Sequence, residues 1–201
     1  MTMASGNEPS GSLFASARER RLWSWTLAVV VAIYSTLGLA RTLAGVLRDE
    51  GILVAAFAFG MVLVGATVVV LGLRKRPGAA EIGIALGIAA AYFMVMLRMA
   101  LPEERTHLIE YGVVAVFIHE ALKERARQGR RVPIPALLAI AAASVVGVID
   151  ECIQAFIPSR VFDPEDILFN FLAALMAVVS SVALSWARRR RDRVRRETGR
   201  R

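Results

Sequence analysis

Long apolar runs, separated by short charged segments, constrain this chain more than any other feature. The cleanest run, residues 51–73, has no charged side chain in 23 positions. A helix needs about 20 predominantly apolar residues to cross a bilayer, and only helices and closed barrels satisfy their backbone polar groups there. The composition agrees, because 56% of the 201 residues are hydrophobic and the mean hydropathy is +0.54. The pattern predicts an all-α integral membrane protein.

Six apolar runs define the expected organisation of the chain. They lie at residues 22–40, 51–73, 79–97, 107–122, 132–149 and 167–187. Residues 1–21 are expected to form a disordered cytoplasmic N-terminus and residues 22–187 a single transmembrane helical domain. Residues 188–201 form a basic cytoplasmic tail, and no internal repeat is apparent.

Two of the runs have a second interpretation. Residues 22–40 follow three arginines, as the apolar part of a signal peptide does, but no A-x-A cleavage site follows and the run can span. Residues 107–122 are short and contain two histidines and two glutamates, so they would also fit an interfacial helix. We treat both runs as spans, the second because of the charges in the loops.

Those charges are distributed unevenly. If the N-terminus is cytoplasmic and all six runs span, 20 of the 25 Lys and Arg residues lie on the cytoplasmic side. Cytoplasmic loops carry such an excess. If residues 107–122 did not span, the basic loop 123–131 would fall outside and the bias would weaken. The charges therefore predict a six-helix polytopic bundle in the cell inner (plasma) membrane, with both termini in the cytoplasm.

The basic tail also decides what the net charge of +8 means. Nine arginines lie between Arg188 and Arg201, directly after an apolar run. Such a tail is typical of contact with the anionic lipids of a membrane face, so the charge does not indicate nucleic acid. The single cysteine, Cys152, excludes an internal disulfide and a cysteine-based metal site.

The polar residues of segment 147–170 are the strongest functional signal. A charged side chain within a membrane span costs roughly 2.5–3.5 kcal/mol on insertion scales and marks a functional site by default. Under the predicted topology this segment lies on the same outer side as the start of run 107–122, so the polar ends of three helices should meet. The segment contains Asp150, Glu151, Gln154, Arg160, Asp163, Asp166 and Asn170.

Helical spacing divides these residues into two faces. Asp150 and Glu151 precede Gln154 by four and three residues, so both can reach it. A carboxylate near a helix C-terminus opposes the helix dipole, so a simple helix end does not explain them. Asp166 and Asn170 share a face of the last helix, where Asn170 lies a turn inside the membrane and needs a partner.

Two members of the segment have structural explanations beside functional ones. Asp163 directly precedes Pro164, a pattern typical of a helix N-cap. Arg160 presents a fork of donors suited to a phosphate or carboxylate ligand, but it would equally pair with Asp150, Glu151 or Asp163 and fix the loop.

The start of run 107–122 supplies a third set. His107, Glu110 and Tyr111 are spaced so that they share one face of a helix. A histidine can act as acid, base or ligand near neutral pH. The alternative is a histidine that merely tolerates the membrane–water boundary.

Two sequence patterns together resemble the VanZ-like family of bacterial membrane proteins, named for a teicoplanin-resistance protein. The first is ERTHLIEY at residues 104–111, where a histidine and an aromatic residue open a helix. The second is DECIQ at 150–154, then PSR at 158–160, followed by an aspartate and an asparagine. The resemblance covers about residues 104–177. It implies a role in the cell envelope and in glycopeptide tolerance but supplies no reaction. The family often has a glycine after the asparagine, where this chain has Ala173 and Ala174.

Three functions remain open, and the sequence does not decide whether the protein is an enzyme. The first is binding or modifying a lipid-linked envelope component, such as a polyprenyl-phosphate-linked glycan or a peptidoglycan precursor. Membrane lipids are the expected partners, and the carboxylates would also suit a divalent cation. The second is a non-catalytic structural membrane protein, and the third a proton-coupled transporter. For the first, the candidate catalytic residues are His107, Glu110, Asp150, Glu151 and Asp166, and the candidate binding residues are Tyr111, Gln154, Arg160, Asp163 and Asn170.

Overall fold

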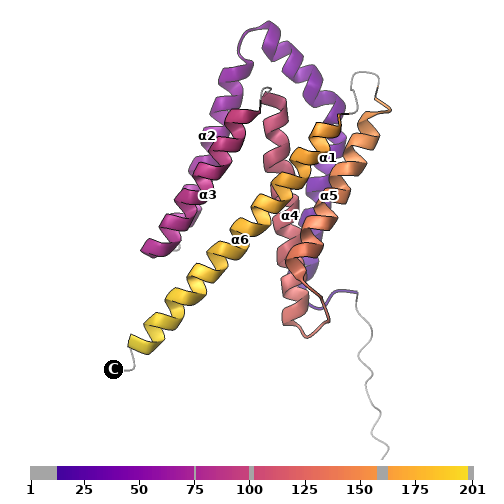
Figure 1. Ribbon diagram of the computed structural model, residues 1–201. Coiled ribbons are helices and arrows are strands. Elements are labelled where there is room, and N and C mark those ends of the chain that lie inside the picture. Colours follow the sequence, from indigo (N-terminus) through magenta and orange to yellow (C-terminus); the bar gives the residue numbers. More distant parts are fainter. Residues whose placement is uncertain (1–12, 75, 100–101, 158–162, 199–201) are drawn as a thin grey trace, which may run out of the picture.

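The structure, a computed structural model, describes residues 13–74, 76–99, 102–157 and 163–198 (Figure 1). These residues contain helices and short connections and no strand, which confirms the all-α class. Each helix matches one predicted apolar run, although α2 and α5 begin two and three residues after the predicted start, and most helices extend beyond their run into charged sequence. The helices are α1 (Ala17–Asp49), α2 (Leu53–Leu73), α3 (Ala79–Arg98), α4 (Pro102–Arg127), α5 (Pro135–Gln154) and α6 (Pro164–Thr198).

Four helices in the described residues, α2, α3, α5 and α6, are long and apolar enough to cross a membrane. Helix α1 is a fifth if its two parts, Ala17–Leu37 and Thr42–Asp49, count as one span despite the 58° bend between them. Helix α4 fails the same criterion because its charged residues are closely spaced. The helices therefore support four or five spans by composition, against the six expected.

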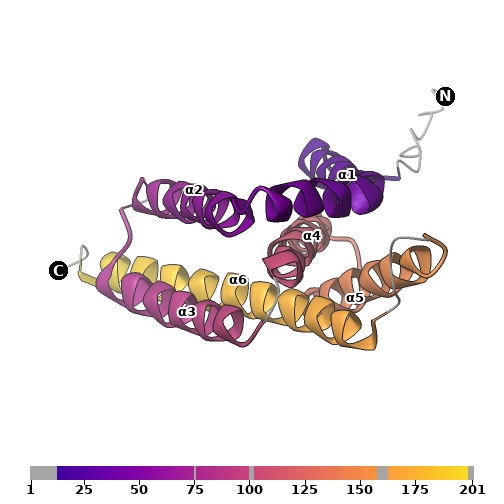
Figure 2. The same cartoon turned by 90° about the horizontal axis from the view of Figure 1, so that it is seen from above.

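Helix α4 nevertheless occupies the centre of the bundle. It contacts α1, α5 and α6, and Figure 2 shows it between α1 and the α5–α6 pair. Its neighbours cover most of its length, so its polar side chains are sheltered from lipid by protein. The buried apolar side chains of α4 are Leu108, Tyr111, Val114, Ala115, Ile118 and Ala121.

Small residues bring α5 and α6 close to each other and to α4. Such residues let membrane helices approach backbone to backbone. Gly147 shows the closest approach, because a Cβ built on it would lie 2.7 Å from the Cβ of Asn170. Ala173 and Ala174, which stand where the related pattern often has glycine, are both fully buried, so alanine fits this contact.

Helices α2 and α3 lie outside this bundle. No residue of the Leu53–Val70 segment of α2 is buried, whereas α3 runs beside α6 (Figure 2). The start of α3 is attached to the end of α6, because the buried carboxylate of Glu81 accepts Arg188 Nε at 3.3 Å and also pairs with Arg191. Two arginines of the basic tail therefore bind protein, and the tail continues α6 as helix to Thr198.

The start of α1 and the end of α6 lie at the same end of the molecule. Figure 1 shows both at the lower end of the bundle, opposite the end of α5 and the start of α6. Helix α1 begins at Ala17, inside the segment expected to be disordered, and residues 1–12 of that segment lie outside the described residues.

Candidate functional site

The polar residues of α4, α5 and α6 meet at the upper end of the bundle in Figure 1, where α4 and α6 begin and α5 ends. The sequence predicted this meeting. Most of the side chains lie inside the protein. Six of the candidate residues are at most 5% exposed: His107, Tyr111, Asp150, Glu151, Gln154 and Asn170.

His107 is held between two residues of α6. Its Nδ1 lies 3.0 Å from Asn170 Oδ1, and its Nε2 lies 4.0 Å from Asp166 Oδ2. Because Asn170 Oδ1 only accepts, this hydrogen bond assigns the proton of the neutral ring to Nδ1. Nε2 is then free to take up a proton beside the Asp166 carboxylate, which is the arrangement of a positioned acid–base group.

Tyr111 extends the site toward α5. Its ring stacks on the His107 ring, with centroids 5.9 Å apart and planes inclined by 6°. Its hydroxyl lies near the Asp150 carboxylate, but in the described part of the chain neither Tyr111 Oη nor Asp150 Oδ1 forms a hydrogen bond of good geometry. Asn170 Nδ2 is likewise buried without a partner there.

These three atoms define a polar layer that the described side chains do not satisfy. Each is fully buried, and an unsatisfied buried polar group costs about 1–3 kcal/mol. Ordered water or a polar ligand would supply the missing partners. The layer between α4, α5 and α6 is therefore suited to a small polar group.

Asp150, Glu151 and Gln154 form a connected lock at the end of α5. Gln154 Nε2 donates to Asp150 Oδ2 at 3.2 Å and to Glu151 Oε1 at 3.0 Å. The backbone N–H of Asp163 donates to Glu151 Oε2 at 3.2 Å, which joins the end of α5 to the start of α6. Three of the four carboxylate oxygens are thus bound by protein, which favours a positioning role for this pair.

The two remaining candidates that the structure describes, Asp163 and Glu110, have different surroundings. Asp163 Oδ1 accepts the backbone N–H of Glu165 at 2.8 Å, as expected for an N-cap of α6, and its side chain is exposed. Glu110 is partly exposed, and its charge acts on Tyr111. Arg160 lies outside the described residues.

The described donors do not form a site for a divalent cation. No group of three or more His, Cys, Asp or Glu side chains in the described ranges is arranged to hold a metal ion. His107 Nε2 and Asp166 Oδ2 are 4.0 Å apart, while Gln154 Nε2 and the backbone N–H of Asp163 bind the carboxylates of Asp150 and Glu151.

Sequence reasoning missed two contributors from the middle of apolar runs. Tyr34 of α1 donates from its hydroxyl to the Val146 carbonyl at 2.8 Å, which places the hydroxyl within electrostatic range of Asp150. Gly147 is the position against which Asn170 packs. Only the occurrence of a tyrosine and a glycine within apolar runs marked them in the sequence.

A second buried polar network lies at the opposite end of the bundle and joins α1 to α4. Glu19 is fully buried and accepts Arg125 Nη1 at 2.9 Å. Glu124, beyond the apolar run of α4, accepts hydrogen bonds from Gln128, Ser16 and Arg18. The Gln128 hydrogen bond, together with the others and nearby guanidinium groups, holds the pKa of Glu124 below its usual value. This network is structural, because its charges are paired with one another.

Comparison with known proteins places the chain in a family. No curated protein and no solved structure matches it. A sequence model of the VanZ/LLP1 family matches residues 11–185, so the similarity extends beyond residues 104–177 and includes α1, α2 and α3. The chain is therefore a polytopic membrane protein that belongs to the VanZ/LLP1 family.

Proposed function

We propose that this protein binds and modifies the polar part of a lipid-linked component of the bacterial cell envelope, at the cluster around His107. One observation carries the proposal. The imidazole is only 5% exposed, Asn170 fixes its Nδ1, and its Nε2 faces Asp166 near the end of a membrane bundle. Holding a histidine in one orientation beside a carboxylate is useful for proton transfer and unnecessary for helix packing.

The charges around His107 indicate which ligand chemistry fits. Asp150 and Asp166 are hydrogen-bond acceptors, so they favour hydroxyl or amino groups, as carried by a glycan or a peptidoglycan precursor. In the proposed step, Nε2 of His107 takes a proton from such a group, and Asp166 stabilises the imidazolium that results. A phosphate is an acceptor and fits these residues less well.

We infer further that all six helices span and that the site faces the outside. Helix α4 runs the length of the bundle and is covered by α1, α5 and α6, which allows a charged helix to span. The orientation follows from the excess of Lys and Arg at the end of the bundle that holds the start of α1 and the end of α6.

Labelling of single cysteines in intact cells tests this topology. In a Cys152→Ala background, Glu165→Cys should react with an impermeant maleimide from outside, whereas Arg131→Cys should react only after permeabilisation. Both positions are exposed. The reverse pattern, or reaction of both from one side, would exclude the six-span arrangement.

A structural role is the second candidate, supported by the lock of Asp150, Glu151 and Gln154. Polar networks stabilise contacts between membrane helices. If the whole cluster served this purpose, substitutions of His107 and Asp166 would lower the yield of folded protein.

His107→Gln and Asp166→Asn separate the two candidates, with His119→Gln as the matched control. His119 is a buried histidine of the same helix, near the opposite end of the bundle. We expect the first two variants to fold normally, to lose the lipid-linked ligand detected by native mass spectrometry, and to lose any effect on glycopeptide susceptibility. Retention of the ligand and phenotype by both variants would exclude the proposed function.

A further inference from the structure

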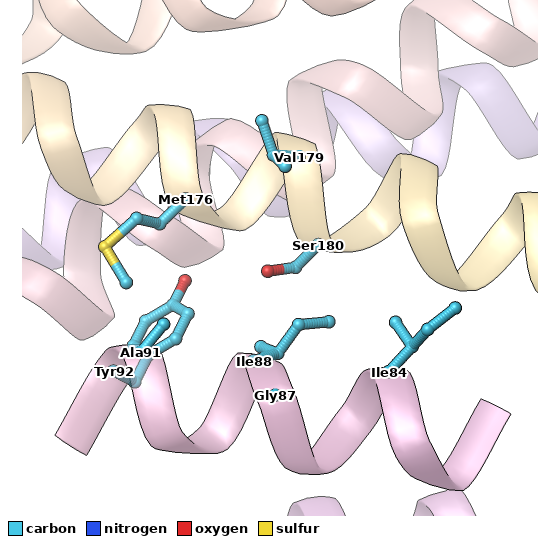
Figure 3. A pocket seen from close by; sticks show the side chains of 8 residues that line it. All are labelled: Ile84, Gly87, Ile88, Ala91, Tyr92, Met176, Val179 and Ser180. Carbon is cyan, nitrogen blue, oxygen red and sulfur yellow. The ribbon is translucent and has the colours of Figure 1, made fainter. Parts of the chain in front are cut away.

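An apolar groove lies between α3 and α6, about halfway along each helix. It encloses about 310 Å³, and Figure 3 shows isoleucines of α3 directed toward α6 across it. Among the described residues that line it, none is charged, so in a bilayer its contents are hydrocarbon. We call it the α3/α6 groove; its walls include Ile84, Ile88 and Tyr92 of α3 and Met176, Val179 and Ser180 of α6.

The α3/α6 groove offers space for part of a single hydrocarbon chain. It has a volume of about 310 Å³ and runs beside α3 from Ile84 to Tyr92, over which the helix rises by about 12 Å.

The α3/α6 groove adjoins the site around His107. Tyr92 and Met176, which line the groove, pack against Leu108 and Tyr111 of α4, and Tyr111 stacks on His107. A single layer of side chains therefore separates the two.

A path also leads from the site to the groove along the surface of α6. Phe169, Leu172 and Met176 are partly exposed and lie on one stripe of the helix, starting beside Asp166. From Asp166 to Met176 the helix rises by about 15 Å. A chain attached to a polar group at Asp166 would reach the α3/α6 groove after this distance.

We propose that the α3/α6 groove receives the hydrocarbon chain of a polyprenyl phosphate derivative whose polar part lies at the His107 cluster. The inference rests on the proposed function for the position of the polar part. A ligand with one long chain can place part of that chain in the groove while its polar part stays at the cluster. The groove would thus contribute to binding the lipid, and the polar cluster would act on its head.

Photo-crosslinking in nanodiscs tests the groove directly. The probe is a sugar-bearing polyprenyl phosphate with a diazirine near the middle of its chain, and labelled peptides are mapped by mass spectrometry. We expect labels on α3 around Ile88 and on α6 around Val179, and few on α2. Gly87→Leu should reduce labelling about fivefold, because Gly87 lines the groove and no atom lies within 4 Å of its built Cβ.

Gly83→Leu is the matched control. Gly83 lies one turn away on α3, has the same free space, and does not line the groove. Both changes replace glycine by a good helix former, so neither should impair folding. Equal labelling of the wild type and both variants would overturn the proposal. Equal groove labelling by a diazirine phosphatidylglycerol would also overturn it, because bulk lipid would then fill the groove.

The same experiment distinguishes failure of the groove from failure of the site. If Asp166→Asn abolishes labelling and Gly87→Leu does not, the polar site holds the lipid and the groove proposal is wrong. If Gly87→Leu abolishes labelling while Asp166→Asn and His107→Gln leave it unchanged, the chain alone holds the lipid and the proposed function fails.

Discussion

His107 and Asn170 are joined by a hydrogen bond of 3.0 Å inside the bundle, across 63 residues of sequence. The contact connects α4, which brings the titratable ring, to α6, which orients it. It depends on a third helix as well, because Asn170 occupies space left by the missing side chain of Gly147 on α5. The orientation of the histidine is thus a property of three helices packed together.

Gly147→Ala should therefore disturb the site through packing. The added Cβ would lie 2.7 Å from Asn170 Cβ and 3.0 Å from its Nδ2, so α5 and α6 must move apart, because rotating the Asn170 side chain does not move its Cβ. We expect a loss of about 1–3 kcal/mol in the free energy of unfolding, measured by thermal denaturation in detergent. Gly60→Ala, with no atom within 4 Å, should leave stability unchanged or raise it. A Gly147→Ala protein as stable as wild type would contradict this packing.

The tautomer of His107 can be observed directly, because the chain has only two histidines. In a His119→Gln background, nitrogen NMR of labelled histidine should show Nδ1 protonated and Nε2 unprotonated in the neutral ring, since Nδ1 donates to Asn170. Adding Asn170→Leu removes the acceptor, so the two nitrogens should exchange their proton and give averaged shifts. A neutral ring protonated at Nε2 would show that Asn170 does not orient it.

The sequence predicted the helices and the meeting of their polar ends, because both follow from local rules. Apolar runs locate helices, and the loop charges suggested which helix ends share a side. The helix ends were less well predicted, since hydropathy marks the apolar stretch while the helix continues through charged residues, as α6 does to Thr198. The six spans and the orientation stay predictions.

Contacts between residues far apart in the chain could not be predicted from the sequence. In the sequence, Glu81 is a carboxylate at the start of an expected helix. Its pairing with Arg188, 107 residues away, depends on how α6 crosses the bundle. Arg188 itself was expected to face lipid. Gly147 was one glycine in an apolar run, and its role became visible only once Asn170 was packed against it.

Glu81→Gln should release the end of α6 from α3. In these pairs the side chains of Arg188 and Arg191 remain 41% and 27% exposed to solvent. Each pair therefore contributes at most about 1 kcal/mol to holding α6 against α3. That loss should raise the rate of tryptic cleavage after Arg188 and Arg191 about fivefold, because cleavage requires local opening of the helix. Glu197→Gln, which removes an exposed carboxylate from the same helix, should not change the rate. Equal rates in both variants would mean that the Glu81 pairs do not hold α6.

The α1–α4 network should make stability depend on acid pH through Glu124. Its pKa is held below the usual 4.5 in the folded protein, chiefly by the Gln128 hydrogen bond and then by Ser16 and nearby guanidinium groups. A carboxylate with a lowered pKa stabilises the folded state above its unfolded pKa, and the contribution disappears as pH falls through the folded pKa. Thermal midpoints of wild type and Glu124→Gln should therefore differ at pH 7 and converge below about pH 4.5. If the thermal midpoints of the two proteins differed by the same amount at every pH, the ionised carboxylate of Glu124 would not hold α1 against α4.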